Sequence, residues 1–318
     1  MILIVSHADD VHATRVLGTL SARGADAVLF DLADFPLKTS IDVAAGDHSS
    51  QDINITVETD GGTYDFGEVR AVWWRRPRQF GMDPDMRSEE DRQFAYNECY
   101  SAVWGMWLCL EPFWVNHPMQ EEAASRKVYQ LKAARQAGLR IPETCITNSP
   151  ERAAAFASAQ GGRTVYKAFS ATESAWRETR LLRPEELPLL EQVRNAPVIF
   201  QRYIEAGYDL RITIIGDRIF PARILSQEQD YKVDFRIHIN DVKIEPCTLP
   251  AGVEAGLRSL MDRLGLVYGA IDMRLTPEGE YVFLEINPTG QWLFIEAATG
   301  QPIAAAVADL LIRHDLGP

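Results

Sequence analysis

The sequence predicts an α/β protein built from more than one packed unit. Its first thirty residues favour a parallel sheet, because strands are expected over Ile2–Val5 and Ala27–Phe30 with a helix over about Ala8–Arg23 between them. Two further observations are a meander of alternating strands over residues 196–225 and a strand hairpin over residues 269–291. A chain of 318 residues is long enough for two or three such units.

The composition limits the classes of partner. It is that of an ordinary globular protein, with 46% hydrophobic and 24% charged residues. A net charge of −13 argues against a nucleic-acid or membrane-surface binder, whose footprint would be basic. The four cysteines form no C-x-x-C pair, which favours free thiols in a reducing compartment. The start MILIVSHADD reads as a strand, and no apolar run is long enough for a membrane span, so we expect a cytoplasmic protein.

The N-terminal third continues with a hairpin and an arginine cluster. Asp60-Gly61-Gly62 is a favoured turn sequence, and the strand that follows runs into Arg75, Arg76 and Arg78. Arginine forks match carboxylate and phosphate oxygens, so the cluster is suited to an acidic peptide or a phosphate. Pairing with the chain's own surplus of acidic residues is an equally good interpretation, and the sequence leaves both open.

Helices are then expected over residues 88–110, about 120–137 and 151–159. They are followed by an alternating strand, Arg163–Phe169, in which Lys167 interrupts an otherwise apolar pattern. A lysine in such a position is hard to explain as a surface residue, which favours a functional role. The closing segments are a helix over 251–264, the hairpin, a loop and a last helix to about Arg313.

The hairpin carries the strongest chemical signal. With Pro277–Glu280 as a four-residue loop, Thr276 is expected opposite Tyr281, Arg274 opposite Phe283 and Asp272 opposite Glu285. Side chains alternate along a strand, so Asp272, Glu285 and Asn287 should share one face, and Val282, Leu284 and Ile286 the other.

Two carboxylates directly opposite each other repel, so a positive charge is expected between them. Two carboxylates and an amide oxygen are hard ligands suited to Mg²⁺, with Mn²⁺ as the alternative. Because Mg²⁺ usually shares itself with substrate phosphates, the hairpin indicates a nucleotide site. The competing interpretation is an exposed hairpin with scattered acidic residues.

Several stretches resemble the ATP-grasp ligases, and within them the graspetide maturases that cross-link microviridin-type peptides. The similarity to ribosomal-protein glutamate ligases is more distant. The stretches are Ser125-Arg126-Lys127, IPETCITNSP (141–150), VYKAF (165–169), FQRYIEAGYDLRITIIGD (200–217) and IDMRLTPEGEYVFLEINPTGQW (271–292). The resemblance implies an ATP-grasp fold of α+β subdomains behind an N-terminal pre-ATP-grasp α/β domain. The expected boundaries are residues 1–117 for that domain, 118–197 for the central subdomain and 198–318 for the C-terminal subdomain with the metal site.

The resemblance also implies roles for individual residues. Lys127 and Lys167 would hold the nucleotide phosphates, and Asp209 would bind the ribose. Arg211 and Arg223, and by a weaker match Arg236, would face an acyl phosphate. Gln201, Arg202, Tyr203 and Ile204 would form the hinge whose backbone reads adenine. Asp272, Glu285 and Asn287 fall on the magnesium positions. The pattern departs from the family at Arg202, where the glutamate ligases commonly carry an acid, and at loop 170–174, which lacks glycines.

The function expected from this resemblance is ATP-dependent activation of Asp or Glu side chains in a ribosomally made precursor peptide. The activated groups would be joined to Thr or Ser hydroxyls as esters, or to Lys amines as amides, giving a macrocycle. The implied partners are a peptide with a leader and an acidic, Thr-rich core, and a second copy of the chain. Two alternatives stay open: an amino-acid or peptide ligase that acts on a small molecule or protein terminus, and a nucleotide-binding scaffold without turnover.

Overall fold

The structure is a computed structural model that describes residues 1–46, 53–169, 179–228, 233 and 242–317. It divides into two compact units, Met1–Glu121 with Pro302–Pro318, and Glu122–Gln301. The second break lies where the sequence predicted no boundary, because residues 302–318 were expected to belong to the C-terminal subdomain. Helix α8 (Ile303–Asp315) instead packs against α1 (Val11–Ala22) and β6 (Ala71–Trp74) of the first unit, and the N-terminal amine lies 2.6 Å from the Asp315 carboxylate.

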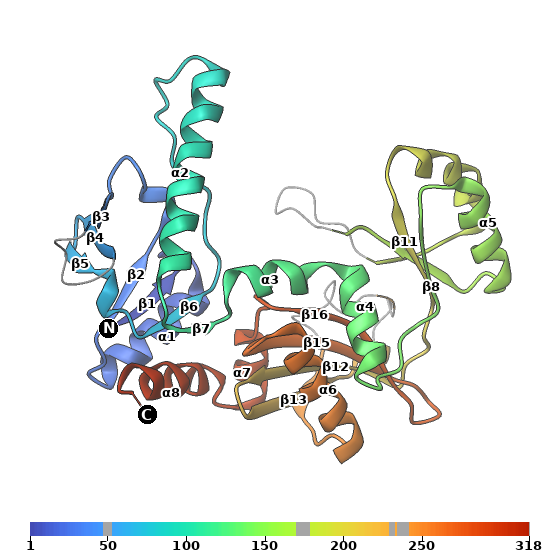
Figure 1. The fold of residues 1–318 in the computed structure, drawn as a ribbon. Helices are drawn as coiled ribbons and strands as arrows, with labels where there is room; N and C mark the ends of the chain where they lie inside the picture. Colours follow the sequence, from blue (N-terminus) through green and yellow to red (C-terminus); the bar gives the residue numbers. More distant parts are fainter. Residues whose placement is uncertain (47–52, 170–178, 229–232, 234–241, 318) are drawn as a thin grey trace. The chain divides into compact units, whose positions relative to one another are not determined.

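The first unit is a parallel sheet with helices and a small antiparallel sheet (Figure 1). The strands of the parallel sheet follow the order β2-β1-β6-β7, and β3-β4-β5 form the antiparallel sheet. This confirms the predicted β-α-β start, although α1 begins three residues later than expected, after the N-cap Asp10. Its elements are β1 (Ile2–Val5), α1 (Val11–Ala22), β2 (Ala27–Phe30), η1 (Leu32–Asp34), β3 (Ser40–Ala45), β4 (Ile53–Thr59), β5 (Gly62–Asp65), η2 (Phe66–Glu68), β6 (Ala71–Trp74), α2 (Glu89–Cys109), β7 (Phe113–Val115) and α8 (Ile303–Asp315).

The core of the first unit lies between the parallel sheet and the base of α2. Trp107 stands at its centre and contacts the rings of Phe30, Phe66, Trp74 and Trp114. Aromatic side chains contribute large buried areas, so this cluster fixes the lower part of α2 against the sheet. Among the described residues of α2, only Val103, Met106 and Trp107 are buried, and the N-terminal part of the helix extends beyond the sheet (Figure 1).

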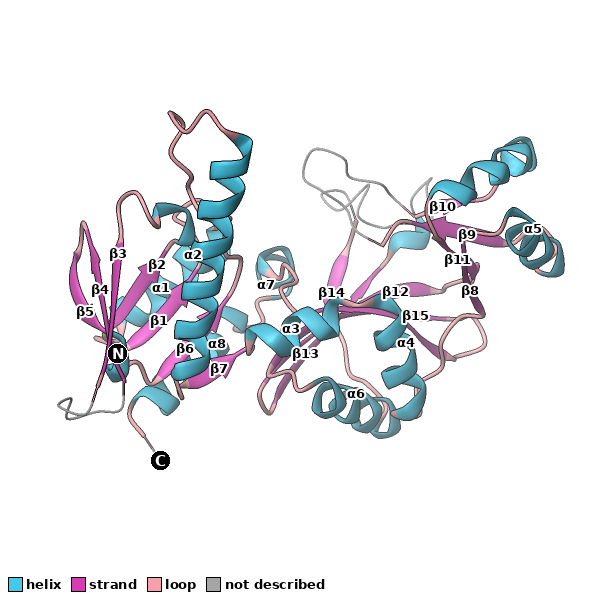
Figure 2. Ribbon diagram, turned by 45° about the horizontal axis from the view of Figure 1, so that its top comes forward, coloured by secondary structure: helices cyan, strands magenta, loops and turns pink. Residues whose placement is uncertain are grey.

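The second unit contains two sheets (Figure 2). The smaller follows the order β10-β9-β11-β8 and packs on α5 and η3, whereas the larger follows β14-β13-β12-β15-β16 and packs on α4 and α6. The elements are α3 (Pro118–Ser125), which begins in the first unit, α4 (Lys127–Gln136), β8 (Thr144–Thr147), α5 (Pro150–Ala159), β9 (Thr164–Lys167), β10 (Arg180–Leu181), η3 (Pro184–Asn195), β11 (Val198–Arg202), β12 (Tyr208–Ile215), β13 (Arg218–Ile224), η4 (Ser226–Glu228), β14 (Ile244–Pro246), α6 (Ala251–Leu264), β15 (Tyr268–Leu275), β16 (Tyr281–Asn287) and α7 (Leu293–Thr299).

Two differences from the predicted elements affect the site. The helix expected over 120–137 is broken at Arg126, whose ψ of 108° is extended, so Lys127 becomes the first residue of a new helix, α4. The loop expected over residues 291–300 contains helix α7. The break at Arg126 has no glycine or proline signal, which is why pattern alone did not find it, whereas α7 ends at a left-handed Gly300 and has no side-chain cap at its start.

Candidate active site

The hairpin of β15 and β16 places two carboxylates opposite each other. Asp272 pairs with Glu285 across the strands, as predicted. The remaining predicted pairs were wrong by one residue, since Arg274 lies opposite Val282 and Leu275 opposite Tyr281. The turn is one residue shorter than expected, because the N–H of Thr276 donates to the carbonyl of Glu280 at 2.9 Å, so that only residues 277–279 lie between this pair.

A β-bulge reconciles the shorter turn with the correct carboxylate pair. The register shifts between Asp272 and Met273, where β16 carries one extra residue. An extra residue reverses which face the side chains take, so Phe283, and not Val282 or Leu284, joins Ile286 in the hydrophobic core. The predicted apolar face was therefore wrong on the turn side of the bulge, while the metal side kept its phase.

Asp272 forms a buried ion pair with Arg211 on the neighbouring strand β12. Nη1 of Arg211 lies 2.8 and 3.0 Å from the two carboxylate oxygens, and its Nη2 donates to the carbonyl of Gln291 at 2.9 Å. Burial opposes the charge of Arg211, but Asp272 outweighs it and raises the arginine pKa. The predicted catalytic arginine thus remains cationic beside the predicted metal ligand.

Glu285 has a cation of its own. Nζ of Lys127 lies 2.8 Å from the Glu285 carboxylate, and both side chains keep about a fifth of their surface exposed. Gln130, one turn further along α4, holds this helix against the strand, because its side-chain amide donates to the carbonyl of Ile286 at 2.8 Å and accepts from its N–H at 3.2 Å. Sequence reasoning missed Gln130, whose only signal was its place three residues after Lys127.

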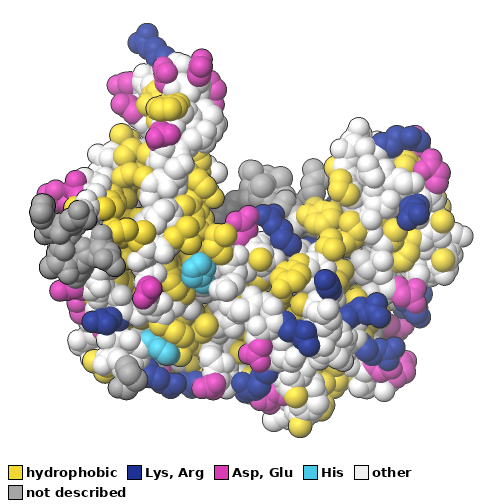
Figure 3. Space-filling model, viewed as in Figure 1, with side chains coloured by type: hydrophobic (Ala, Val, Ile, Leu, Met, Phe, Trp, Pro, Cys, Tyr) yellow, Lys and Arg dark blue, Asp and Glu magenta, His cyan; other side chains and the backbone are white. Residues whose placement is uncertain are grey.

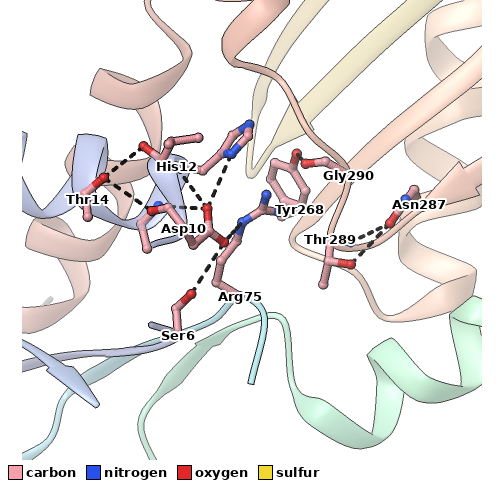
Figure 4. A network of polar contacts seen from close by, with 11 residues as sticks. Ser6, Asp10, His12, Thr14, Arg75, Tyr268, Asn287, Thr289 and Gly290 are labelled. Atoms are coloured by element: carbon pink, nitrogen blue, oxygen red, sulfur yellow. Dashed lines mark hydrogen bonds and ion pairs between the residues drawn. The ribbon is translucent and has the colours of Figure 1, made fainter. Parts of the chain in front are cut away.

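Asn287 follows on the same strand, opposite Ala270. Its Oδ1 accepts from the N–H of Thr289 at 2.9 Å and from the Thr289 hydroxyl at 3.3 Å (Figure 4). The next residue, Gly290, accepts from the Tyr268 hydroxyl at 2.6 Å. A Cβ on Gly290 would lie 2.3 Å from that of Ala270 and 2.9 Å from Nη2 of Arg211, so only glycine fits there.

The donor set fits a hard divalent cation. Asp272 and Glu285 face each other, and Asn287 lies two residues beyond Glu285 on the same strand. Carboxylate and amide oxygens are the ligands that Mg²⁺ and Mn²⁺ prefer. In the part of the chain that the structure describes, no three His, Cys, Asp or Glu side chains gather as metal ligands, so any cation here depends on two carboxylates and an amide. Lys127 and Arg211 balance the carboxylate charge in the structure as it stands.

The predicted hinge connects the two sheets of the second unit. Gln201 is buried and donates to Thr144 at 3.0 Å, whereas Arg202 is exposed and lies 3.7 Å from Glu143. The N–H of Tyr203 donates to the carbonyl of Arg163 at 2.8 Å, and the carbonyl of Ile204 accepts from Arg274 at 2.7 Å. The hinge backbone is therefore held from both sides.

A cavity of about 460 Å³ borders the hinge, and neither Asp272 nor Glu285 lines it. Its wall combines charged residues from the hinge and from the turn of the hairpin, including Arg163, Arg202, Glu205, Glu278 and Glu280. None of the described residues that line it is a predicted phosphate or metal residue. We therefore place the chemistry at Asp272 and Glu285 and not in this cavity.

The other predicted residues have different surroundings. Lys167 is half-buried at the end of β9, opposite Ile199. Asp209 is buried and accepts from Arg274 and Ser226. Arg223 lies partly exposed on β13 and donates to Glu245 at 2.8 Å. Arg236 and the predicted phosphate-covering loop lie outside the described residues.

The arginine cluster of the first unit is mostly paired with its own acidic residues. Arg75 is buried and lies 3.2 Å from Asp10, which also caps α1 (Figure 4), and Arg78 pairs with Asp31. Burial opposes ionisation of Asp10, but the hydrogen bond from His12 and the charge of Arg75 outweigh it and lower the Asp10 pKa. This confirms internal pairing for two of the three arginines and leaves the role of Arg76 a hypothesis.

Comparison with known proteins identifies relatives of both units of the chain. A family model of the MvdD pre-ATP-grasp domain matches residues 1–122. Macrocyclase MdnC from Microcystis aeruginosa MRC, solved with its precursor peptide MdnA, is 31% identical over 98% of both chains, with a TM-score of 0.84. A RiPP-associated ATP-grasp ligase from Chryseobacterium gregarium, solved with ADP and a leader and core peptide, is 28% identical over 100% of this chain and 97% of that one, with a TM-score of 0.89.

A more distant similarity covers part of the chain only. The D-alanine–D-alanine ligase of Azoarcus sp. (strain BH72) is 31% identical over 97 residues, which are 28% of this chain and 32% of that ligase. Fold and site together define an ATP-grasp ligase preceded by a pre-ATP-grasp domain. Within that class, the chain belongs to the family of graspetide maturases that includes MdnC.

Proposed function

We propose that this protein uses ATP to activate Asp or Glu side chains of a ribosomally made peptide and joins them to hydroxyl or amine side chains of the same peptide. The observation that carries the proposal is the pair Asp272 and Glu285, facing each other beside Lys127 and Arg211. The two full-length relatives described above, one solved with a precursor peptide and one with ADP and a leader and core peptide, support the peptide substrate.

The reaction has two steps. A peptide carboxylate oxygen attacks the γ-phosphorus of ATP, the bond to the β,γ-bridging oxygen breaks, and ADP leaves. A Thr or Ser hydroxyl, or a Lys amine, then attacks the acyl carbon, loses its proton, and inorganic phosphate leaves. The first step is needed because a carboxylate has a poor leaving group and an electron-rich carbon.

The chain's residues supply charge and position for this chemistry, which is most of what phosphoryl transfer requires. Lys127 and Lys167 would hold phosphate oxygens, and residues 201–204 would read adenine through their backbone. Arg211 would steady the oxyanion of the second step, with Arg223 and Arg236 as further candidates. Mg²⁺, or alternatively Mn²⁺, held by Asp272, Glu285 and Asn287, would neutralise charge that develops on the phosphates.

Mass spectrometry tests the proposal. A candidate peptide rich in Thr, Asp and Glu is incubated with the enzyme, ATP and Mg²⁺, and each link formed should lower its mass by about 18 Da, the mass of one water, with one ADP released per link. Omission of ATP is the control. Peptides that retain their full mass while free amino acids become joined would contradict the proposal.

That second outcome would favour an amino-acid ligase. The partial similarity to a D-alanine–D-alanine ligase is the specific observation that keeps this candidate. The mechanism would be the same and only the acceptor would differ. Release of phosphate from ATP in the presence of single amino acids, without any peptide, separates the two functions.

We also propose that the protein acts as a homodimer through helix α2. Phe94 and Leu108 are 67% and 65% exposed, and they lie 14 residues apart, close to four helical turns, so both are on one side of the helix. Figure 3 shows hydrophobic side chains along this tall helix. Analytical ultracentrifugation of the wild type and of Phe94→Glu tests the dimer, which the charge should dissociate.

A cytoplasmic location remains part of the proposal. All four cysteines are free thiols, which suits a reducing compartment. Among the described helices, no single one is long and apolar enough to cross a membrane. Helices α7 and α8 taken together, as a bent pair, have the length and apolar composition of a span. Cell fractionation with an antibody against the protein checks the location.

A further inference from the structure

Strands β12 and β15 carry the same short motif in opposite directions. The motif is Asp-x-Arg, as Asp209-Leu210-Arg211 on β12 and Asp272-Met273-Arg274 on β15. Because the strands are antiparallel and in register, Arg211 lies opposite Asp272 and Asp209 lies opposite Arg274. Each aspartate therefore pairs with the arginine of the other strand, and the two ion pairs stand two residues apart.

The second pair is the more deeply buried of the two. Nε of Arg274 lies 2.7 Å from one Asp209 oxygen, and the other oxygen accepts from the Ser226 hydroxyl. The side chains are 5% and 3% exposed, against about 10% for Arg211 and Asp272. Both carboxylate oxygens of Asp209 are thus engaged by the protein, which leaves this residue poorly placed to bind ribose hydroxyls.

The remaining nitrogens of Arg274 donate to backbone carbonyls, one of which belongs to the hinge. Nη1 donates to the carbonyl of Ile204 at 2.7 Å, and Nη2 donates to the carbonyl of Val233 at 2.9 Å. The guanidinium also lies 5.3 Å from the centre of the Tyr203 ring, a favourable cation–π distance. Burial opposes the charge of Arg274, but Asp209 outweighs it and raises the arginine pKa, so the contacts are made by a cation.

We propose that Arg274, oriented by Asp209, is a positioning residue that fixes the adenine-reading hinge, and that Asp209 acts through Arg274 and not as a ribose ligand. The inference rests on the proposed function only in taking residues 201–204 as the nucleotide hinge. Residues 203–207 follow the end of β11 without regular structure, so the hinge has no strand ladder to hold it there. Arg274 supplies that support through Nη1 on the Ile204 carbonyl, while Nε on Asp209 and Nη2 on Val233 fix the guanidinium in place. A planar fork of five N–H groups can do this, whereas a lysine ammonium, a point charge, cannot match its geometry.

Binding of Mg-ADP, measured by titration calorimetry without peptide, tests the inference. Arg274→Lys keeps a charge beside Asp209 but loses the fork, and should weaken ADP binding at least about tenfold, the equivalent of one lost hydrogen bond to a charged group. Asp209→Asn keeps the arginine and should weaken binding less than Arg274→Lys. This experiment measures binding and not turnover. A wild type without ligase activity would therefore contradict the proposed function but would leave the binding result valid.

A second ligand separates positioning from ribose contact. If Asp209 held the ribose, Asp209→Asn would remove most of the preference for ADP over 2′,3′-dideoxy-ADP, whereas our proposal expects the wild-type preference.

Leu264→Ala, in the core of the second unit on α6, is the control for general destabilisation and should leave both affinities unchanged. Wild-type ADP affinity in Arg274→Lys would overturn the inference, as would a lost preference in Asp209→Asn. The Asp209→Asn comparison stands even if Arg274→Lys fails to fold.

Discussion

Glu285 and Glu121 are two half-buried carboxyl groups, each near an Asp–Arg pair, but they differ in what compensates them. Glu285 has Lys127 at 2.8 Å and keeps a fifth of its surface exposed. Glu121 has a buried oxygen that no group in the described chain hydrogen-bonds, and burial raises its pKa to about 8 against the opposing charge of Arg75. The first carboxyl is therefore suited to a cation and the second to a proton.

Burial alone therefore does not decide which carboxyl groups of this acidic protein bind a cation. A carboxylate near the surface of a site can exchange one cation for another, so Lys127 can be joined or replaced by a metal ion at Glu285. A carboxyl whose buried oxygen has no hydrogen-bond donor lowers its charge by keeping its proton. Charge, access and partner together decide which chemistry is possible.

The largest effect is expected from Glu285→Gln. The change keeps the shape but removes the charge that would hold the metal ion and that Lys127 pairs with. Turnover should fall by at least about 10²-fold, as when one charge-stabilising group is lost from an active site. The measurement is ADP release with a peptide substrate, and Glu278→Gln, in the exposed turn of the same hairpin, is the matched control. Undiminished turnover would mean that the hairpin carries no metal site.

A smaller effect should follow Gly290→Ala, which tests the cation side of the comparison. The new methyl group would lie 2.3 Å from Cβ of Ala270 and 2.9 Å from Nη2 of Arg211, so the loop and Arg211 must shift. A displacement of about 1 Å at a catalytic group can cost about 10²-fold in rate, so we expect a fall of about 10- to 100-fold in kcat. Gly18→Ala, where a Cβ meets nothing within 4 Å, should leave kcat unchanged. Equal rates in the two variants would argue that Arg211 does not act in the reaction.

Glu121→Gln tests whether Glu121 keeps its proton in the folded protein. The folded protein holds the Glu121 proton up to about pH 8, whereas an unperturbed glutamate releases it near pH 4.5. Because the folded state binds the extra proton in between, this group makes stability fall as pH rises from 4.5 to 8, by up to about 1.4 kcal/mol per pH unit. Glutamine cannot ionise, so the variant should gain stability over the wild type as pH rises.

Urea unfolding at pH 5.5, 7.5 and 9 measures this gain. The difference between variant and wild type should grow between the first two values and level off above pH 8. A difference that stays constant with pH would show that Glu121 is ionised in the folded protein. Glu90→Gln, in the first turn of α2, where the glutamate is exposed, is the control and should show no such trend.

The sequence predicted the parts of this site that depend on short periods. A β-α-β start predicted the parallel sheet, and alternation placed Glu285 and Asn287 on one face of β16. The pairing of Asp272 with Glu285 was predicted from a four-residue turn, and it was correct because the shorter turn and the bulge shift the register in opposite directions. Pattern could not predict the bulge in β16, opposite the step from Asp272 to Met273, since no glycine or proline marks it. It also missed the contact of Gln130 with Ile286, which joins residues 156 positions apart.

Partners of charged residues were the least predictable feature. Asp209 was expected at the ribose, yet Arg274 and Ser226 occupy both of its oxygens. The repeated Asp-x-Arg motif was visible in the sequence, but its meaning needed the register of β12 against β15. Likewise Lys127 alone on a helix was weak evidence of a site until the break at Arg126 brought it to Glu285.

The smallest effect is expected from Arg140→Ala, which removes an ion pair outside the site. Arg140 pairs with Glu280 of the hairpin turn, but the two side chains are 63% and 44% exposed. An exposed pair is screened by solvent and salt, so its loss should cost less than about 1 kcal/mol in the free energy of unfolding and leave turnover unchanged. Urea unfolding of Arg140→Ala, Glu280→Ala and the double variant isolates the pair energy. Exposed ion pairs are expected to be screened at 0.5 M salt. A large coupling energy that persists at this salt concentration would contradict the prediction. It would show that solvent exposure does not distinguish weak surface ion pairs of this protein from the buried pairs of its site.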